Sequence, residues 1–366
     1  MTIVFSTLVS RAQEDGLFNY IVYLLKALEK CDIQNRYIIL VNKEFDKRLK
    51  FKNSNFRKVI INIPDSPKII RRPLYFFWQT FLMPFKIKEN IDLLHLPNPI
   101  PFFNIYNIKT VVTIHDMAEY HGMRYNYFHR LYRKIAYITC IRASKSIITV
   151  SKFSKNEIAN FLKISKDKIK VTSLGSSFFK MKLKSAIKEN IKTYYLHFGS
   201  NLLNKNTDRV IKSYMKNRKD YSTKLYIIGD YKELNFTDNE RFQLEKKGVL
   251  FIGYISKKAL KDYYLGALAL IYPSFYEGFG LPILEAMSLG VPVITSNRTS
   301  MPEVAGNAAL YVNPESESEI AEAMGEIALN EKFREYMVEE GYKQSKKYNW
   351  NKTAIKTLNV YEKAHF

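Results

Sequence analysis

The chain has few of the residues that build disulfide frameworks, metal sites or membrane spans. Among its 366 residues are two cysteines, Cys31 and Cys140, with no CxxC pair, so neither a disulfide scaffold nor a cysteine zinc site is expected. No apolar run reaches the roughly 18 residues of a spanning helix, and the apolar start lacks the basic lead of a signal peptide. These absences predict a cytoplasmic protein without a membrane span.

Strand and helix patterns alternate along the whole chain, which predicts an α/β fold with parallel sheets. The length and the 46% hydrophobic content favour two domains. Expected strands are residues 2–6, 37–41, 58–63, 92–96, 110–114, 146–150 and 168–172, then 194–200, 224–229, 249–253, 267–273, 291–296 and 308–312. Expected helices lie near 17–30, 74–90, 126–143, 152–163, 205–217, 257–266 and 281–289, with three more from about residue 316.

Positive charge is concentrated in the first half. Residues 1–190 hold 33 Lys and Arg against 14 Asp and Glu, a net +19, whereas residues 191–366 hold 24 against 21, a net +3, and the two sum to the +22 of the whole chain. A basic half can attract nucleic acid, anionic lipid or a phosphorylated acceptor. A general lysine bias is the alternative, but bias alone should not favour one half.

The segment YEGFGLPILEAMSLGVPVI, residues 276–294, carries the clearest functional signal. An apolar run of strand length precedes it, and Gly278 and Gly280 allow a sharp turn with exposed N–H groups. Pro282 suits a first helical position, and the apolar residues that follow have helical spacing up to Gly290. The unit is therefore a strand, a glycine turn and a helix N-terminus.

A helix N-terminus has unpaired N–H groups and about half a positive charge, so it favours an anion. Glu277 lies just before the turn and Glu285 lies one turn into the helix, where each carboxylate can accept hydrogen bonds from hydroxyls of one ligand. A ligand with both phosphate and hydroxyl groups, such as a sugar nucleotide, fits this arrangement. The plainer alternative is a solvated glutamate pair beside a turn.

With Gly-Phe-Gly-Leu-Pro between its glutamates, this segment resembles the donor signature of the retaining family 4 glycosyltransferases, which have the GT-B fold. The resemblance continues through VLFIGYIS (249–256), MPEVAG (301–306) and YNW near residue 350. It implies two Rossmann-like domains whose parallel sheets face each other across a cleft. The expected division is an acceptor-binding domain at 1–180, a linker at 181–193, a nucleotide-sugar donor domain at 194–348 and a C-terminal helix at 349–366 that crosses back to the first domain.

The resemblance also implies roles for single residues of the second half. Lys205 follows a strand and a glycine turn and matches the lysine that contacts the donor diphosphate, while Asn204 stands where an arginine is common. Glu277 is expected to bond the donor sugar and Glu285 the ribose. The implied donor-binding set is Gly16, Ser200, Lys205, Glu277, Gly278, Phe279, Gly280, Leu281 and Glu285.

In the first half, His115 follows a β-branched strand in VVTIHDMAEY, and its counterpart in similar enzymes lies beside the donor sugar. The catalytic set expected from the resemblance is therefore His115, Lys205 and Glu277, with Asp116 orienting the His115 loop. Gly16 opens a helix after the first strand, and its backbone is expected near the diphosphate. Relatives often have two or more glycines at that point.

The implied reaction transfers a sugar from a UDP- or GDP-linked donor to an acceptor hydroxyl with retention at the anomeric carbon, and it requires no cofactor. The chain has no DxD triplet, so the leaving diphosphate is expected to be met by Lys205 and the helix N-terminus rather than by a metal ion. The acceptor is expected to be a lipid-linked or polysaccharide glycan of a bacterial surface.

Other interpretations remain open at this level. The pI of about 9.6 suggests a nucleic-acid-binding protein, although no RNP-type segment or zinc-finger spacing is present, and no nucleic-acid partner is expected. A GT-B epimerase or phosphorylase is a second alternative. Residues 68–88 interleave aromatics with basic ends and could lie on a membrane surface. We favour instead a helix that packs Trp78, Phe81 and Leu82 onto the sheet, with peripheral membrane contact left to basic residues such as Arg133.

Overall fold

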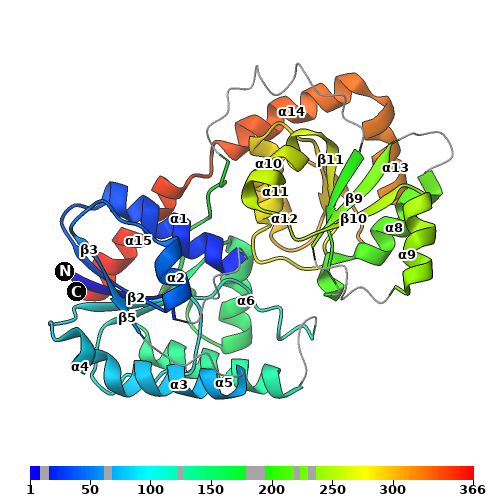
Figure 1. Ribbon diagram of the computed structural model, residues 1–366. Coiled ribbons are helices and arrows are strands. Elements are labelled where there is room, and N and C mark those ends of the chain that lie inside the picture. Colours follow the sequence, from blue (N-terminus) through cyan, green and yellow to red (C-terminus); the bar gives the residue numbers. More distant parts are fainter. Residues whose placement is uncertain are drawn as a thin grey trace. The chain divides into compact units, whose positions relative to one another are not determined.

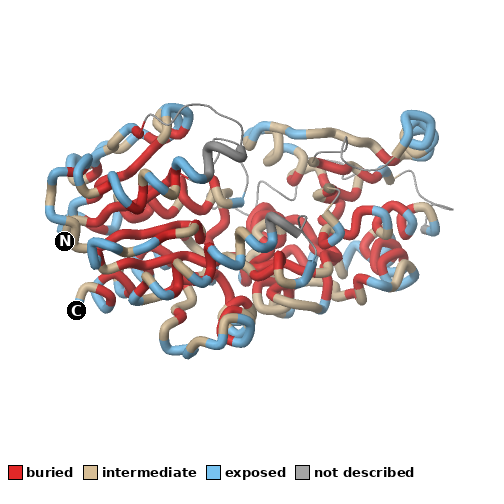
Figure 2. Tube along the Cα trace, turned by 90° about the horizontal axis from the view of Figure 1, so that it is seen from below, coloured by how far each residue is buried: buried red, intermediate tan, exposed pale blue. Residues whose placement is uncertain are grey.

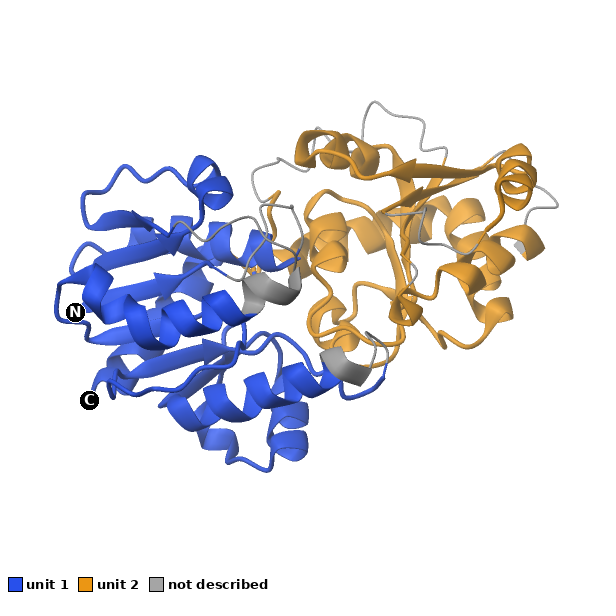
Figure 3. Cartoon of the chain, turned by 60° about the horizontal axis from the view of Figure 1, so that its bottom comes forward, with its two compact units in different colours: residues 1–174, 350–366 blue, residues 175–349 orange. Residues whose placement is uncertain are grey.

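The computed structural model describes residues 1–8, 16–61, 68–122, 127–178, 194–200, 202–217, 223–229 and 236–366, with only the backbone for 68–72, 127–129 and 217. The chain divides into two compact units (Figure 3). Unit 1 comprises Met1–Leu174 and Trp350–Phe366, and unit 2 comprises Gly175–Asn349. The predicted linker at 181–193 lies outside the described residues.

Unit 1 is built on a parallel sheet with the strand order β3-β2-β1-β4-β5-β6-β7. Its strands are β1 (Thr2–Ser6), β2 (Arg36–Val41), β3 (Phe56–Ile60), β4 (Leu93–Leu96), β5 (Thr110–Thr113), β6 (Ser146–Thr149) and β7 (Ile169–Val171). Each strand falls on an apolar run that was predicted as a strand. Because parallel neighbours cannot be joined by tight hairpins, the chain returns through long crossovers, most of them helical (Figure 1).

The helical segments of unit 1 are α1 (Gly16–Cys31), α2 (Lys43–Arg48), α3 (Lys68–Phe77), the π-helical turn η1 (Trp78–Leu82), α4 (Met83–Ile87), α5 (Tyr127–Ala143), α6 (Lys152–Leu162), the 3-10 turn η2 (Lys166–Lys168) and α15 (Trp350–His365). The sequence pattern did not predict α2, whose N-terminus is capped by Asn42, with its side-chain oxygen accepting from the Phe45 N–H. The helix expected over 74–90 begins earlier, at Lys68, and is interrupted by η1.

The π-helical turn changes which side chains face the sheet. Trp78 packs against the core as expected, but Phe81 is 37% exposed and Leu82 is 41% exposed, so the expectation that both pack on the sheet is wrong. A π turn carries more residues per turn than an α-helix and shifts the following side chains around the axis. Gln79 and Thr80 are buried instead, and Gln79 accepts a hydrogen bond from the Ser6 hydroxyl.

Both faces of the unit 1 sheet are covered, and the strands form a buried layer (Figure 2). Alternate strand residues point to opposite faces. Val4, Ile38, Leu94 and Val112 belong to a cluster that also contains Tyr137 of α5. Ile3 and Phe5 alternate with Val4 and therefore point to the other face, which α1 and α15 cover together.

The C-terminal helix α15 is tied to unit 1 at several points. Trp350 stacks on Tyr23 with ring centres 5.5 Å apart, and Thr353 donates to the Ser173 carbonyl over 2.6 Å. The Tyr361 hydroxyl bonds Nδ1 of His95, whose Nε2 lies 2.8 Å from the Thr113 hydroxyl. Burial, with a smaller contribution from His115, lowers the pKa of His95 to about 3, so this ring is neutral at physiological pH.

Unit 2 repeats the architecture with the parallel order β10-β9-β8-β11-β12-β13. Its strands are β8 (Tyr194–Phe198), β9 (Lys224–Ile228), β10 (Val249–Gly253), β11 (Ala267–Tyr272), β12 (Val293–Ser296) and β13 (Leu310–Val312). Its helical segments are the 3-10 turn η3 (Leu203–Lys205), α8 (Thr207–Asn217), α9 (Asp238–Lys246), α10 (Lys257–Leu265), α11 (Leu281–Ser288), α12 (Met301–Ala305), α13 (Glu317–Leu329) and α14 (Glu331–Ser345). The two parallel sheets confirm the α/β prediction.

Two helices of unit 2 were not predicted from the sequence. One, α9, begins with a capping box between Thr237 and Glu240, a signal that its sequence carries. The other, α12, has five residues and too little periodicity to detect. Across the part of the chain that the structure describes, every helix is too short or too polar to span a bilayer.

The bond between Tyr361 and His95 generates a stability prediction. Tyr361→Phe leaves a buried ring nitrogen without its partner and is expected to lower the free energy of unfolding by about 1–3 kcal/mol in urea titrations. Tyr336→Phe is the matched control, because Tyr336 is 54% exposed and its hydroxyl can bond water. Equal effects of the two substitutions would show that this bond does not hold α15 on the sheet.

Candidate functional site

The chain between β11 and α11 forms a strand, a turn and a helix start. Gly280 is the N-cap of α11 and has a φ of +98°, a conformation that side-chain-bearing residues rarely adopt. A Cβ at that position would lie 3.1 Å from Cδ1 of Ile283. Pro282 lies in the first turn, where its missing N–H leaves no helical bond unmade. The turn and the helix start thus consist of Gly278, Phe279, Gly280 and Leu281, as the sequence predicts.

Lys205, Tyr272 and Glu277 form one hydrogen-bonded cluster. The Lys205 Nζ donates to Oε1 of Glu277 and to the Tyr272 hydroxyl, over 2.8 Å each. The Tyr272 hydroxyl in turn donates to the same carboxylate oxygen over 2.8 Å. The Lys205 and Glu277 side chains are 20% and 10% exposed, so the ion pair is partly desolvated but still reachable from solvent.

Strand order explains why these residues meet. Lys205 follows β8, Tyr272 ends β11, and β8 and β11 are neighbours in the sheet. Sequence reasoning identified Lys205 and Glu277 but not Tyr272, which it treated only as part of a strand. Its position as the last strand residue before the glycine turn was the available signal.

The Glu277 backbone is held by a second turn. Its N–H donates to the Thr299 hydroxyl over 3.3 Å, and its carbonyl accepts from the Ser300 hydroxyl over 2.7 Å. Thr299 has a φ of +58°, which is unusual for a β-branched residue and shows a tightly constrained turn. The contacts of Thr299 and Ser300 with the Glu277 backbone were not predicted from the sequence, because nothing in the local sequence connects residues 299–300 with Glu277.

Asn204 faces inward rather than toward a ligand. Its side-chain N–H donates to the Tyr276 carbonyl over 3.0 Å, and its own carbonyl accepts from the Phe275 N–H over 2.9 Å. Asn204 is fully buried, and its Oδ1 has no partner among the described residues. At this position the chain fastens η3 to the turn before Glu277 instead of presenting a cation.

Glycines allow a close approach of backbone at the ends of β8 and β9. A Cβ on Gly199 would lie 2.5 Å from Cγ2 of Ile227, and a Cβ on Gly229 would lie 2.1 Å from the Gly199 carbonyl oxygen. Ser200, which follows Gly199, donates its N–H to the Thr207 hydroxyl over 3.4 Å and accepts at Oγ from the Leu202 N–H over 3.2 Å. The predicted site residue Ser200 therefore lies in the loop that leads to Lys205.

Glu285 lies on α11 and is buried, with both carboxylate oxygens bonded. Ser177 donates to Oε1 over 2.8 Å and Tyr264 donates to Oε2 over 3.2 Å. Burial raises the pKa of this carboxyl above its usual 4.5, and the Lys257 charge with the two hydroxyl donors partly offsets that effect. A ligand hydroxyl can reach Glu285 only through the remaining lone pairs of these oxygens.

His115 of unit 1 is half-buried just after β5, and its ring meets that of Tyr20 edge-on at 4.6 Å. Its Nε2 lies 2.9 Å from the Pro97 carbonyl, which can only accept, so Nε2 carries the proton. Burial is the main cause that lowers the pKa of His115, and the neutral ring therefore keeps an acceptor at Nδ1. Asp116 accepts from the Ala118 N–H and so shapes the loop.

Gly16 begins α1, and residues 9–15 before it lie outside the described residues. The predicted role of its backbone therefore stays a prediction. Within the described ranges, no three His, Cys, Asp or Glu side chains are grouped closely enough to form a metal site. The charged groups of the unit 2 cluster are instead one ammonium and one carboxylate.

Two family models match the chain. Residues 15–175 match glycosyltransferase family 4, and residues 179–344 match the glycosyl transferases group 1. The O-antigen chain mannosyltransferase B of Escherichia coli is 31% identical over 69% of this chain and 70% of its own. The O-antigen chain mannosyltransferase RfbU of Salmonella typhimurium is 29% identical over 85% of this chain and 87% of its own.

Solved structures share the fold. The structure of Anabaena Alr3699/HepE in complex with UDP and glucose superposes with a TM-score of 0.73 at 14% identity, covering 98% of this chain and 99% of that one. The two parallel-sheet units thus define a GT-B protein of the glycosyltransferase class. With its family models and relatives, the chain belongs to the family 4, group 1 glycosyltransferases.

The buried state of Glu285 generates a prediction with a defined pH dependence. A raised pKa means that the folded protein holds this proton more tightly than the unfolded chain, so ionisation of Glu285 removes stability as the pH rises above about 4.5. Glu285→Gln cannot ionise and is expected to unfold at higher urea concentration than the parent at pH 7. The gain should shrink toward pH 4.5.

The matched control is Glu335→Gln, which makes the same substitution on an exposed residue of unit 2. A parent and a Glu285→Gln variant of equal stability at pH 7 would contradict the burial argument.

Proposed function

We propose that the chain is a retaining, metal-independent glycosyltransferase that takes a sugar from a nucleotide-diphosphate donor bound by unit 2. The Lys205–Glu277 pair beside the glycine turn is the observation that supports this function most strongly. It offers a cation for phosphate and a carboxylate for sugar hydroxyls within one hydrogen-bonded cluster. Few ligands other than a sugar nucleotide require both groups together.

In the proposed reaction the bond between the anomeric carbon and the diphosphate oxygen breaks, and the acceptor hydroxyl oxygen forms the new bond on the same face. Negative charge then collects on the diphosphate. Lys205 and the positive end of the α11 dipole are the groups proposed to stabilise it, because a fixed ammonium and a helix N-terminus both favour an anion. The proton lost by the acceptor is taken up by the departing phosphate oxygen.

The remaining residues have positioning roles in this proposal. Glu277 accepts from a donor-sugar hydroxyl while its backbone stays fixed by Thr299 and Ser300. Glu285 accepts from a ribose hydroxyl. His115 accepts from a sugar hydroxyl at Nδ1, a role that its lowered pKa keeps available down to mildly acidic pH. The backbones of Gly16 and Ser200 lie along the diphosphate.

Donor and acceptor are proposed from relatives. The curated relatives named above are O-antigen chain mannosyltransferases, which favours a mannosyl donor and a surface-polysaccharide acceptor. One fold neighbour was solved with UDP and glucose, so both UDP- and GDP-linked donors are to be tested. We assign acceptor binding to unit 1 and donor binding to unit 2. Family membership disfavours a nucleic-acid-binding protein, and the transferase activity named for the curated relatives disfavours an epimerase or phosphorylase.

Peripheral membrane contact through unit 1 is part of the proposal, and its basis is an exposed apolar face. This face, called the aromatic face below, consists of Leu74, Phe77, Phe81, Leu82, Phe85, Phe103, Ile105, Tyr106, Leu131, Ile135 and Ile138. Its parts touch: the Phe85 and Tyr106 rings lie 6.1 Å apart, and the Tyr106 hydroxyl donates to the Phe81 carbonyl over 2.9 Å. The loop between β4 and β5, which carries Phe103, Ile105 and Tyr106, is tied to α5, where the Thr139 hydroxyl accepts from the Phe102 N–H.

Basic residues border the aromatic face, and acidic ones are absent from its helices. The exposed basic residues are Lys86, Lys88, Arg130, Lys134 and Arg142. Residues 73–88 and 127–143 contain no Asp or Glu. Apolar rings within a cationic rim are complementary to an anionic bilayer surface. Arg133, by contrast, is bonded to Glu119 and to the Pro99 carbonyl, so it is not one of the rim cations.

The donor site is tested by Lys205→Ala and Glu277→Ala. Each is expected to reduce transfer of mannose by about 10²–10³-fold, because each removes one fixed polar contact to the reacting groups. Calorimetry with UDP, GDP and their sugar conjugates in the presence of EDTA should show binding of one nucleotide without metal. Lys212→Ala, which removes an exposed lysine of unit 2, is the matched control and should keep full activity. Unaltered turnover in both site variants would mean that the site is misplaced.

The aromatic face is tested by Phe77→Ser, Phe81→Ser and Phe85→Ser combined. Flotation with phosphatidylglycerol-containing vesicles is expected to fall at least about tenfold, since three rings no longer enter the interface. The control combines Phe242→Ser, Leu329→Ser and Tyr336→Ser, which alter exposed apolar residues of unit 2. Equal flotation of the two triple variants would argue against membrane contact at this face.

A further inference from the structure

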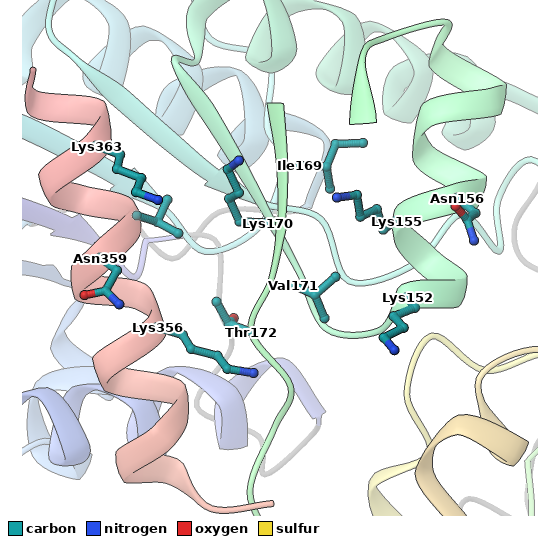
Figure 4. Close-up of a pocket in the computed structure, with 11 residues that line it drawn as sticks. Lys152, Lys155, Asn156, Ile169, Lys170, Val171, Thr172, Lys356, Asn359 and Lys363 are labelled. Atoms are coloured by element: carbon teal, nitrogen blue, oxygen red, sulfur yellow. The ribbon is translucent and has the colours of Figure 1, made fainter. Parts of the chain in front are cut away.

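A groove of about 600 Å³ opens beside β7, the edge strand of the unit 1 sheet. It lies between α6 and α15, and five lysines line it: Lys152, Lys155, Lys170, Lys356 and Lys363 (Figure 4). The side chains of Lys356 and Lys363 extend from α15, and Lys155 extends from α6 toward the same strand. Cations from three separate elements thus surround one concave surface.

The spacing of these residues explains how they meet. Lys152, Lys155 and Asn156 are three and four residues apart on α6, which places them on one helix face. The same spacing recurs along α15, where the residues that line the groove are Lys356, Asn359, Val360 and Lys363. They form a second stripe, meaning a row of side chains on one face of the helix. Because β7 has no strand neighbour beyond it, the two stripes border an open sheet edge rather than another strand.

In the part of the chain that the structure describes, four of the five groove lysines have no partner that balances their charge. Among the described residues that line it, none is acidic. The ammonium groups of Lys155, Lys170, Lys356 and Lys363 make no ion pair or hydrogen bond within the described ranges. Clustered like charges repel one another unless an anion or salt intervenes. On α14, by contrast, the ammonium group of Lys343 is paired with the carboxylates of Glu339 and Glu340.

The base of the groove holds a second, independent feature. Thr172, directly after β7, is 1% exposed, and its hydroxyl has no hydrogen-bond partner among the described residues. An unpaired buried hydroxyl costs about 1–3 kcal/mol, so a native structure usually provides a partner. Ile169 and Val360 supply a buried apolar floor beside it. A hydroxyl donor below a ring of ammonium groups is suited to phosphate oxygens.

We propose that this groove is a binding site for a phosphate-bearing anion with two or more negative charges, separate from the donor site of unit 2. The ligand is either a soluble diphosphate or the headgroup of an anionic lipid, which share the same chemistry. Lysines without carboxylate partners supply the charge, and the Thr172 hydroxyl supplies a directed bond. The proposal does not depend on the glycosyl donor, since none of its residues belongs to the proposed donor site.

The first test measures binding of inorganic pyrophosphate by calorimetry in the Lys205→Ala background, which removes the competing cation of the donor site. Lys155→Glu combined with Lys356→Glu is expected to weaken pyrophosphate binding at least about tenfold. The matched control is Lys47→Glu combined with Lys50→Glu. It makes the same change in net charge on exposed residues that lie near β2 and β3, at the opposite edge of the sheet, and should bind as the parent does.

Thr172→Val separates a binding role from a structural one. It removes the unpaired hydroxyl while keeping the side-chain shape, so urea stability should be unchanged or higher. Pyrophosphate affinity should nevertheless fall about tenfold to a hundredfold, the range for one lost hydrogen bond to a charged ligand. A variant that binds pyrophosphate like the parent would remove Thr172 from the site.

A second test distinguishes the two ligand sources. Flotation with phosphatidylcholine vesicles that contain phosphatidic acid is compared with flotation on phosphatidylcholine alone. If the groove variant loses the phosphatidic-acid-dependent part and the Lys47/Lys50 control keeps it, the ligand is a lipid headgroup. If only pyrophosphate binding is lost, the ligand is soluble. If the groove variant and the control behave alike in both tests, the lysines act only through net charge and the proposal is overturned.

Discussion

Parallel pairing of every strand is the constraint on which both units depend. It forces the chain to return by long crossovers, so all strands of a sheet end at one edge and the residues that follow them gather there. In unit 2, η3 follows β8 and the glycine turn follows β11. Because those strands are neighbours, Lys205 and Glu277 form an ion pair although 72 residues separate them in the chain. In unit 1 the same rule places His115 just after β5.

The sequence predicted what depends on local pattern. Apolar runs rich in Val and Ile identified the strands, and Gly280 with Pro282 identified the start of α11, because φ > 0 and a missing N–H are tolerated at few positions. Features that depend on tertiary packing were not predictable. Asn204 turns inward because Phe275 and Tyr276 pass beside it, and Phe81 is exposed because η1 shifts the helix register. The glycine requirement at Gly199 and Gly229 likewise appears only when β8 and β9 are side by side.

The two glutamates of the glycine-turn segment differ in how the fold treats them. Glu277 keeps one oxygen bonded to Lys205 and Tyr272 and is partly accessible, so a ligand can rearrange its contacts at modest cost. Glu285 is buried, and its pKa is raised, so the fold holds a carboxylate where burial disfavours the charge. A protein optimised only for stability would have a neutral residue at 285. The fold thus holds a carboxylate at 285 at a cost in stability, which is consistent with the ribose contact proposed for it.

Basic residues of unit 1 gather in two different arrangements. On α4 and α5, exposed cations border exposed rings over an extended surface, and the proposed bilayer contact rests on this arrangement. Beside β7, lysines border a groove and act on one compact ligand within a Debye length of about 8–10 Å. A compositional lysine bias predicts neither arrangement, because it would place basic residues among carboxylates, as in the Lys216–Glu317 pair of unit 2 and the Lys58–Asp46 pair of unit 1. The separation of cations from carboxylates at these two surfaces is better explained by the binding of anions than by a lysine bias.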